Sequence, residues 1–407
     1  MTKPMNRYAV RTAVSVLALT AAGNATALEW EVGDARIDLY GYARLNAAVD
    51  FDQDATTDFG TQAGSFDKTV SSEFDKANNR PLSDQEDGEF GVDAEQSRLG
   101  VTVRHKTGVR VTVEGDYRGG DFRLRQAYGE YQGLLAGRTW SNYNSFVGYT
   151  PSVDFDALAG LAGLQDRVAQ VRYTTGNFSV ALEKPIGTGR PQNFNVDTDE
   201  PPSEQDEFSA GDLPSLTARY EGSVNAFSYS VAGVLQQVEG DQGEALQVPG
   251  NTEDKMVGGA AFVAGSFQAT DALTLNATFN VSEGANSYLY RSGDDFGAPD
   301  GFFDGDDMEP ISGYGGSLGL SYTIGKGSLN AGVGAVTNDW DDVEDEYPTD
   351  ATVQTQHETN TNALVNYMYR PVENVMFGAE LQHLDVELVN GEDFDANRAM
   401  FAAEYSF

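Results

Sequence analysis

The chain has 407 residues, with 26 Lys and Arg against 63 Asp and Glu, and a formal net charge of −37. This charge argues against a nucleic-acid-binding protein, because neutralising phosphates requires clustered Lys and Arg. With no Cys and only three His, the chain cannot form disulfides or thiolate sites, and we predict neither a metal site nor a cofactor.

The N-terminus has the pattern of a secretory signal peptide. A basic start precedes an apolar stretch over 13–22, and Ala25-Thr26-Ala27 supplies small residues at the two positions that signal peptidase reads. The apolar stretch is far shorter than the ~20 residues of a membrane-spanning helix. We therefore expect residues 1–27 to be removed by cleavage after Ala27 and residues 28–407 to form one exported domain.

Beyond this segment, apolar and polar residues alternate in short runs. Ile37, Leu39 and Gly41, for example, alternate with Asp38 and Tyr40. Successive residues of a β-strand point to opposite faces, so such runs give one apolar and one polar side. No helical period of comparable length competes with this pattern. Sixteen strands are expected, near 36–50, 96–105, 109–118, 122–132, 134–140, 168–174, 178–184, 214–221, 226–238, 256–267, 272–283, 313–324, 328–338, 357–369, 374–389 and 396–407.

Short and long connections alternate between these runs. The short ones carry turn residues, as in Lys106-Thr107-Gly108. The long ones are acidic, hold nearly all of the net charge, and lie near 51–95, 185–212, 239–254, 283–310 and 338–358. Short turns at one end and long loops at the other are typical of outer-membrane barrels. The predicted fold is thus an all-β, antiparallel transmembrane β-barrel with short periplasmic turns and long acidic extracellular loops.

The acidic loops are interpreted chiefly as solvated surface segments. On the extracellular side they also suit divalent ions that bridge acidic residues to lipopolysaccharide, so lipopolysaccharide and outer-membrane lipid are expected partners. The acidic run that starts at Asp50 does not match an EF-hand, because Ala55 and Thr61 stand where that loop needs Gly and Glu. Weak, non-specific cation binding by the loops stays open as an alternative.

The C-terminus ends in an amphipathic strand. Ala399, Phe401, Ala403 and Tyr405 alternate with polar or small residues, and the chain ends at Phe407. A final strand of this kind that ends in Phe is the sorting pattern of the outer-membrane assembly machinery, which is therefore an expected partner. Together with the signal peptide, it predicts localisation in the cell outer membrane.

Basic residues gather in 96–140, against the acidic trend of the chain. Because Arg facing lipid costs ~2–4 kcal/mol at mid-bilayer, we expect these side chains to face the lumen. The expected lumen arginines are Arg44, Arg98, Arg104, Arg110, Arg118, Arg123, Arg125, Arg138, Arg172 and Arg219. A guanidinium binds carboxylate or phosphate with two parallel hydrogen bonds, so such a wall would draw small anions through the pore.

We assign the pore lining to seven of these residues: Arg44, Arg98, Arg110, Arg123, Arg125, Arg138 and Arg172. The alternative left open for each arginine is an internal ion-pair network with Glu114, Asp116 and Glu183. The fourth and fifth strands fit the pattern least well, because Gln126 and Glu130 would face outward there. A buried subunit interface is one way to accommodate them.

Residues 141–167, between the fifth and sixth strands, are much less acidic than the other long loops. They include Phe146, Leu158, Leu161 and Leu164. We predict that this loop folds into the lumen and narrows it. The alternative is that it packs over a neighbouring subunit.

Three segments resemble the DcaP-like family of trimeric outer-membrane porins: residues 96–101 (QSRLGV), 122–130 (FRLRQAYGE) and 135–142 (LAGRTWSN). The resemblance implies a sixteen-stranded homotrimer, and some members favour small dicarboxylates and other anions. Only about eight residues separate Ala27 from the first expected strand, so the N-terminal coiled-coil segment of some relatives is not expected.

The favoured function is a porin: a water-filled channel for small hydrophilic solutes, not an enzyme. An outer-membrane hydrolase would need a Ser-His-acid arrangement, and His105, His357 and His383 have no motif that supplies one. A structural or adhesin barrel would require a passenger domain or a helix through the pore, for which we find no segment. A secreted β-sandwich would not need the strand ending in Phe407.

Overall fold

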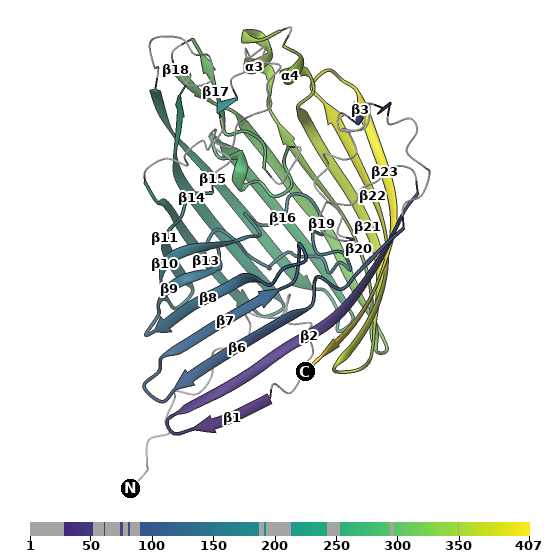
Figure 1. Cartoon of the computed structure of the whole chain (residues 1–407). Coiled ribbons are helices and arrows are strands. Elements are labelled where there is room, and N and C mark those ends of the chain that lie inside the picture. Colours follow the sequence, from purple (N-terminus) through teal and green to yellow (C-terminus); the bar gives the residue numbers. More distant parts are fainter. Residues whose placement is uncertain are drawn as a thin grey trace.

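The computed structural model describes residues 28–51, 61, 74–75, 80–81, 90–186, 191–192, 213–241, 253–293, 297–305, 307–348 and 350–407. The predicted signal peptide and most of the loops 51–95 and 185–212 lie outside the described residues. The described strands form an antiparallel sheet that closes into a 16-strand barrel, because the first barrel strand pairs with the last (Figure 1). The predicted all-β barrel is confirmed.

The barrel strands are close to those expected from the alternation. They are β2 (Ala35–Asp50), β6 (Arg98–His105), β7 (Arg110–Asp116), β8 (Arg123–Tyr131), β9 (Leu134–Trp140), β10 (Arg167–Thr175), β11 (Phe178–Glu183), β13 (Ser215–Val224), β14 (Phe227–Asp241), β15 (Glu253–Gln268), β16 (Leu273–Glu283), β19 (Ser312–Ile324), β20 (Gly327–Asn338), β21 (His357–Val372), β22 (Val375–Leu388) and β23 (Asp393–Ser406).

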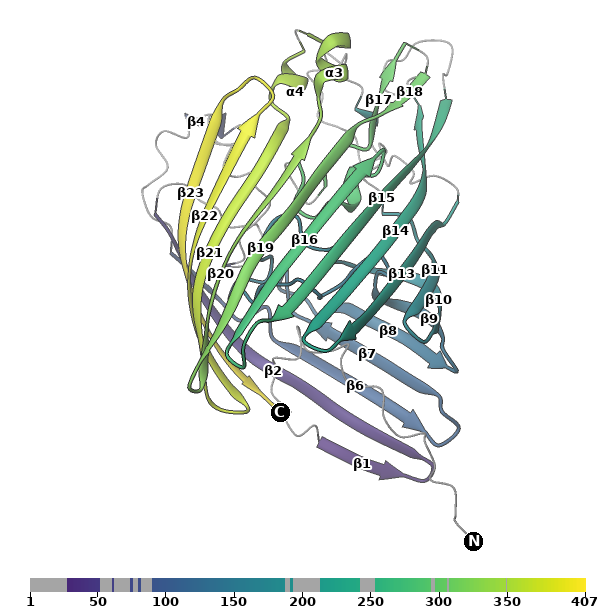
Figure 2. The ribbon, with the colours of Figure 1, turned by 180° about the vertical axis from the view of Figure 1, so that it is seen from behind.

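The wall of the barrel has two heights. Strands β6–β11, here called the low wall, have 6–9 residues each. Strands β14–β16 and β19–β23, the high wall, have 11–16 residues each. Figures 1 and 2 show the high wall rising well above the low wall at the end that carries the long loops.

Alternation along the strands separates an apolar outer face from a polar inner face. On β16, Phe279 is 52% exposed while its neighbours Thr278 and Asn280 are buried. An apolar band facing outward around a polar interior is the arrangement of a transmembrane barrel. Within the described ranges, no helix is long and apolar enough to span a membrane.

Two further strands extend the pairing of β2. Strand β5 (Phe90–Asp93) pairs with its upper half. Strand β1 (Leu28–Val32), which the sequence did not predict, pairs with its lower end, so that Leu28 lies opposite Leu39. Phe407, the last residue, exchanges backbone hydrogen bonds with Gly41. Strand β1 therefore continues the edge of β2 just beyond the point where β23 ends.

The remaining described elements are short and lie in connections. They are β3 (Phe74–Asp75), β4 (Arg80–Pro81), β12 (Pro191–Gln192), η3 (Asn286–Tyr288), β17 (Gly301–Asp304), β18 (Asp307–Pro310), α3 (Asp341–Glu346) and α4 (Ala351–Gln354). The helices α3 and α4, together with β17 and β18, cap the high wall at its loop end (Figure 1).

A β-bulge between β7 and β8 corrects the predicted facing of the fourth and fifth strands. Glu114 pairs with Gln126 but Gly115 pairs with Leu124, so Arg125 is the extra residue. A bulge shifts the alternation by one residue. Consequently Gln126 and Glu130 face the lumen, not outward, and no subunit interface is needed to accommodate them.

Candidate functional site

The loop between β9 and β10, residues 141–166, runs through the barrel interior and is fixed to the opposite wall. Val153 and Asp154 donate backbone hydrogen bonds to Glu380 of β22 at 2.7 and 3.1 Å. Ala159 donates to the side chain of Asn362 of β21 at 2.8 Å. We call this segment the inner loop. Its backbone polar groups are satisfied by the polar lumen face of the high wall.

Close packing of backbones holds the inner loop flat against that wall. Gly160 has a φ of +65° and accepts a hydrogen bond from Thr278 of β16 at 2.6 Å. A Cβ atom at this position would lie 2.4 Å from the backbone nitrogen of Gly316 on β19. Only Gly fits both the left-handed conformation and this approach.

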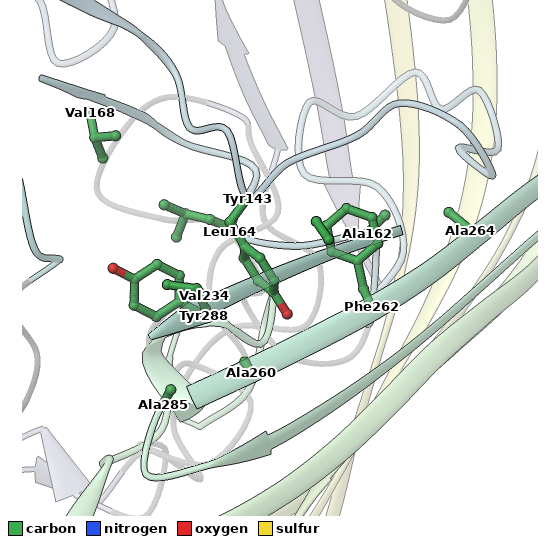
Figure 3. Packing of buried hydrophobic residues seen from close by; sticks show 11 residues of the cluster. Tyr143, Ala162, Leu164, Val168, Val234, Ala260, Phe262, Ala264, Ala285 and Tyr288 are labelled. Carbon is green, nitrogen blue, oxygen red and sulfur yellow. The ribbon is translucent and has the colours of Figure 1, made fainter. Parts of the chain in front are cut away.

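Apolar side chains of the inner loop form a core inside the barrel (Figure 3). Tyr143 packs edge-on against Phe262 of β15 and against Tyr288, with ring centroids 5.1 and 5.7 Å apart. Leu164 joins the same cluster. The polar inner face of the strands is therefore interrupted by an apolar patch where the loop docks.

A buried ion cluster ties the inner loop to the barrel seam. Arg398 of β23 contacts both oxygens of Asp50 of β2, at 2.8 and 3.1 Å, and lies 3.5 Å from Asp154 of the loop. Arg44, also on β2, donates to the carbonyl of Val153. All of the charged side chains in this cluster are buried. The seam and the inner loop are thus held by one set of contacts.

A second segment, described at residues 284–293 and 297–300 and called segment 284–300 here, also folds inward. It belongs to the connection that the sequence assigned to an extracellular acidic loop, so this part of that assignment is corrected. Tyr290 donates to the carbonyl of Asp156 at 2.9 Å, and Arg291 donates to that of Ala157 at 2.8 Å. These hydrogen bonds stack segment 284–300 on the inner loop, so two layers of chain occupy this side of the lumen.

A buried carboxylate organises segment 284–300. Asp300 accepts hydrogen bonds from the backbone and side chain of Ser287, at 2.8 and 3.1 Å, and from Gln236 at 2.9 Å. Burial raises the pKa of Asp300 to about 6. In the unfolded segment the same group titrates near its ordinary value of about 4.

This pKa difference predicts that segment 284–300 becomes more stable as pH falls. The folded segment binds the proton more tightly, so stability rises as pH drops through about 6 and levels off below about 4, by on the order of 2–3 kcal/mol in total. Hydrogen-exchange protection factors of the 285–292 amides at pH 7 and pH 5 measure the change. Asp300→Asn should abolish the difference, and equal pH dependence in wild type and variant would contradict the assignment.

Facing the inner loop, the low wall carries a cluster of arginines and carboxylates. Arg125 contacts Asp116 at 2.5 Å and Glu114 at 3.4 Å, and Arg98 lies 3.5 Å from Glu114. Arg123 contacts Asp116 at 2.7 Å. The bulge at Arg125 places three guanidinium groups around two carboxylates, so the cluster has an excess of positive charge.

Aromatic contacts connect this cluster to the inner loop. The guanidinium groups of Arg125 and Arg118 lie 5.3 and 5.7 Å from the ring centroid of Phe155. Arg118 also lies 3.8 Å from Asp156 of the loop. At the end of the loop, Arg167 stacks on Trp140 at 4.3 Å. The loop thus meets the arginine side of the lumen as well as the high wall.

Two ion pairs that involve low-wall arginines expose the cation and bury the anion, whereas Arg110 and Glu130 are about equally exposed and Arg125 is buried with its partners. In the Arg123–Asp116 pair, 43% of the Arg side chain is exposed but only 1% of the Asp side chain. In the Arg104–Asp38 pair the fractions are 51% and 7%. The charge presented to lumen water by these pairs is therefore positive, although the pairs themselves are neutral.

A further row of lumen side chains lies toward the short turns. Arg36, Arg104 and Arg110 are opposite one another on β2, β6 and β7. Arg110 pairs with Glu130, and Arg172 faces the lumen opposite Leu135. Arg219 contacts the carbonyl of Asn144.

Arg138 lies on the other face of the barrel, which corrects its predicted position. It shares a face of β9 with Leu134, which is 51% exposed, and lies opposite Ala169 on β10. Leu135 and Thr139, on the alternate face, are buried. Arg138 was predicted to face the lumen because it is charged, but the alternation of side chains along β9 turns it outward.

Sequence reasoning missed several arginines of the interior, including Arg398, which joins the seam to the inner loop. Arg36 shares the polar face of the first strand with Asp38, and Arg398 lies on the polar face of the last strand, so the alternation could have identified both. Arg167 and Arg291 are placed by the inner loop and segment 284–300, so no strand pattern could have found them. Within the described ranges, no group of three or more His, Asp or Glu side chains could hold a metal ion.

Comparison with known proteins identifies the architecture. The family model described as "Porin subfamily" matches residues 33–404. The outer membrane channel DcaP of Acinetobacter baumannii is similar in structure, with a TM-score of 0.71 and 24% identity over 93% of this chain and 99% of that chain. OmpT of Vibrio cholerae matches with a TM-score of 0.54 and 13% identity, over 93% of this chain and 100% of that one. The comparison with curated protein sequences gave no match.

Proposed function

The chain belongs to the porin subfamily and is an outer-membrane channel, and we propose that this channel favours small anions such as dicarboxylates and has no enzymatic activity. Passage is by passive diffusion of small hydrophilic solutes through a water-filled lumen. On this proposal no catalytic residue and no cofactor take part.

The observation that carries the anion preference is the unequal exposure within the low-wall ion pairs. Arg123 and Arg104 offer guanidinium groups to the lumen while their carboxylate partners are buried. A guanidinium binds a carboxylate through two parallel hydrogen bonds. A solute with two carboxylates could be passed from the cluster around Arg123 to the row around Arg104 and Arg110.

The acidic extracellular loops oppose this preference. Exposed charges separated by more than ~8–10 Å are largely screened at physiological ionic strength. In the lumen, low-dielectric walls focus the field and weaken the screening. We propose that the narrow part of the lumen between the inner loop and the low wall decides the selectivity, with Arg98, Arg110, Arg123, Arg125 and Arg172 as its lining.

Liposome swelling tests this proposal. Proteoliposomes are placed in isosmotic solutions of succinate, of erythritol or of 1,4-diaminobutane, which have carbon chains of equal length. Swelling should be fastest in succinate, by severalfold over the diamine. Equal rates for all three would indicate an unselective pore, and no swelling above protein-free liposomes would contradict a channel.

We also propose a homotrimer. The outer face of β2 carries the small residues Gly41, Ala43 and Ala47, and the outer side chains of the low wall are mostly apolar and short. Such a face allows close contact between barrels. Light scattering in detergent, with the detergent mass subtracted, should give three times the mass of one chain, whereas a purely monomeric species would refute this.

Two further partners are proposed. Lipopolysaccharide would surround the extracellular half of the barrel, and the outer-membrane assembly machinery would recognise β23 and Phe407. Recognition by the assembly machinery is supported by the outer face of the C-terminal strand, where Phe401, Tyr405 and Phe407 are all exposed.

A further inference from the structure

A row of arginines crosses the lumen face of β2, β6 and β7 at the end that carries the short turns. Arg36 lies directly opposite Arg104, and Arg104 lies opposite Arg110. We call these three residues the exit row. A carboxylate stands at each end of it, because Glu31 of β1 is opposite Arg36 and Glu130 of β8 is opposite Arg110. Like charges directly opposite on neighbouring strands repel each other, so the exit row needs carboxylates close by.

Strand β1 supplies two carboxylates to the exit row. Its register with β2 places Glu29 opposite Asp38 and Glu31 opposite Arg36, so both acids of β1 share the lumen face of β2. Glu29 contacts the guanidinium of Arg36, which also contacts Asp38 at 2.9 Å. Figure 1 shows β1 at the base of the barrel, beside the lower end of β2. The strand thus adds negative charge where a solute leaves the lumen for the periplasm.

The carboxylates around the exit row differ in how firmly the fold holds them. Asp38 is buried, and Glu130 lies on a barrel strand that is paired on both sides. The side chain of Glu29 is 51% exposed, and it belongs to a five-residue strand in which every residue is exposed. A short, exposed element of this kind opens at a low cost in free energy. Of these three carboxylates, Glu29 is therefore the one that a carboxylate from solution displaces most readily.

We propose that Glu29 and Glu31 compete with carboxylate solutes for the exit row and thereby speed the release of these solutes into the periplasm. The inference rests on the proposed anion preference and names the step that β1 controls. A solute that arrives from the cluster around Arg123 binds Arg36 only by replacing Glu29, so its net gain in free energy there is small. Passage requires sites that bind a solute well enough to admit it but weakly enough to let it leave.

The residence time of succinate in the full-length mature channel tests this proposal. In a planar bilayer, interruptions of the ionic current by succinate, or the current noise that they produce, report how long each molecule stays. The double variant Glu29→Gln/Glu31→Gln should lengthen the residence time about two- to fivefold, the range expected when one exposed ion pair no longer competes. Gel mobility of unboiled samples verifies that the variant is folded.

Two controls separate competition from a general effect of charge. Asp34→Asn removes a carboxylate from the turn between β1 and β2, where it pairs with Lys106, and should leave the residence time unchanged. In a channel that already carries Arg36→Gln, adding Glu29→Gln should have no further effect, because the arginine for which Glu29 competes is gone. An unchanged residence time in the double variant, an equal increase in Asp34→Asn, or a persisting effect of Glu29→Gln beside Arg36→Gln would each overturn the proposal.

Ion selectivity in KCl separates this proposal from the proposed function. Removing two carboxylates from the lumen face should move the zero-current potential toward that of an anion-selective channel, whichever ion the wild type prefers. A wild-type channel that prefers cations would contradict the proposed function and leave this shift intact. A wild-type channel that prefers anions, but whose potential and succinate residence time do not respond to the double variant, would refute the competition and leave the anion preference intact.

Discussion

Replacement of Arg398 by Ala is expected to reduce the free energy of unfolding by about 3–5 kcal/mol. Arg398 is fully buried, and it contacts Asp50 of the first barrel strand and Asp154 of the inner loop. Its removal leaves two buried carboxylates without this cation. Because Asp50 and Arg398 are paired across the seam, closure of the barrel and docking of the loop should weaken together.

Equilibrium unfolding in urea, followed by gel mobility of unboiled samples, measures this loss. Lys106→Ala is the control, because its ion pair with Asp34 is exposed and exposed pairs contribute about 0–1 kcal/mol. Replacing Arg398, Asp50 and Asp154 together with apolar or amide residues should recover part of the stability. An Arg398→Ala variant as stable as Lys106→Ala would show that the buried cluster does not hold the seam.

The second large effect is expected on selectivity. Replacing Arg123 and Arg125 together by Ser removes two positive charges and leaves Asp116 and Glu114 facing the lumen. Anion flux should fall, and the reversal potential in a salt gradient should move toward that of a cation-selective channel. The trimer should still assemble.

Two controls make this result interpretable. Arg123→Ser alone changes a side chain that is 43% exposed, so it should shift the potential in the same direction without loss of folded protein. Arg138→Ser removes the same charge from the outer face of the same wall and should leave the potential unchanged. A shift of equal size in Arg138→Ser would mean that net charge, not the lumen lining, governs selectivity.

Strand number and strand positions were predictable because the membrane imposes a simple rule on each residue. Lipid on one side and water on the other enforce alternation, as in β16, where Phe279 and Val281 face outward and Asn280 faces inward. The rule fails where the ladder is irregular. The bulge that leaves Arg125 unpaired has no sequence signal, so the facing of Gln126 and Glu130 was predicted incorrectly.

Arg138 shows the limit of residue chemistry as a guide. Arg138 was assigned to the lumen because an Arg that faces lipid is costly, yet its side chain lies on the outer face of β9. Its neighbours Leu134 and Ala136, four and two residues earlier on the same face, contained the information that decides the direction. The alternation of apolar side chains along this strand was therefore a better guide to the facing of Arg138 than its charge, and it could be read from the sequence.

The inward course of segment 284–300 could not have been predicted. It lies in a connection whose acidic composition indicates a solvated loop, and its burial depends on contacts with Asp156 and Ala157 of the inner loop. Long-range contacts of this kind leave no local pattern. The same holds for Arg291, which is fully buried between the two segments.

The zero-current potential of the wild-type channel across a KCl gradient tests the central claim most directly. A planar bilayer with tenfold more salt on one side, at moderate concentration, gives the sign of the preferred ion. Because the exposed guanidinium groups face the lumen and their carboxylate partners are buried, we expect a zero-current potential with the sign of a channel that passes chloride more readily than potassium. A potential of the sign set by potassium would contradict the claim, because the acidic loops would then control passage.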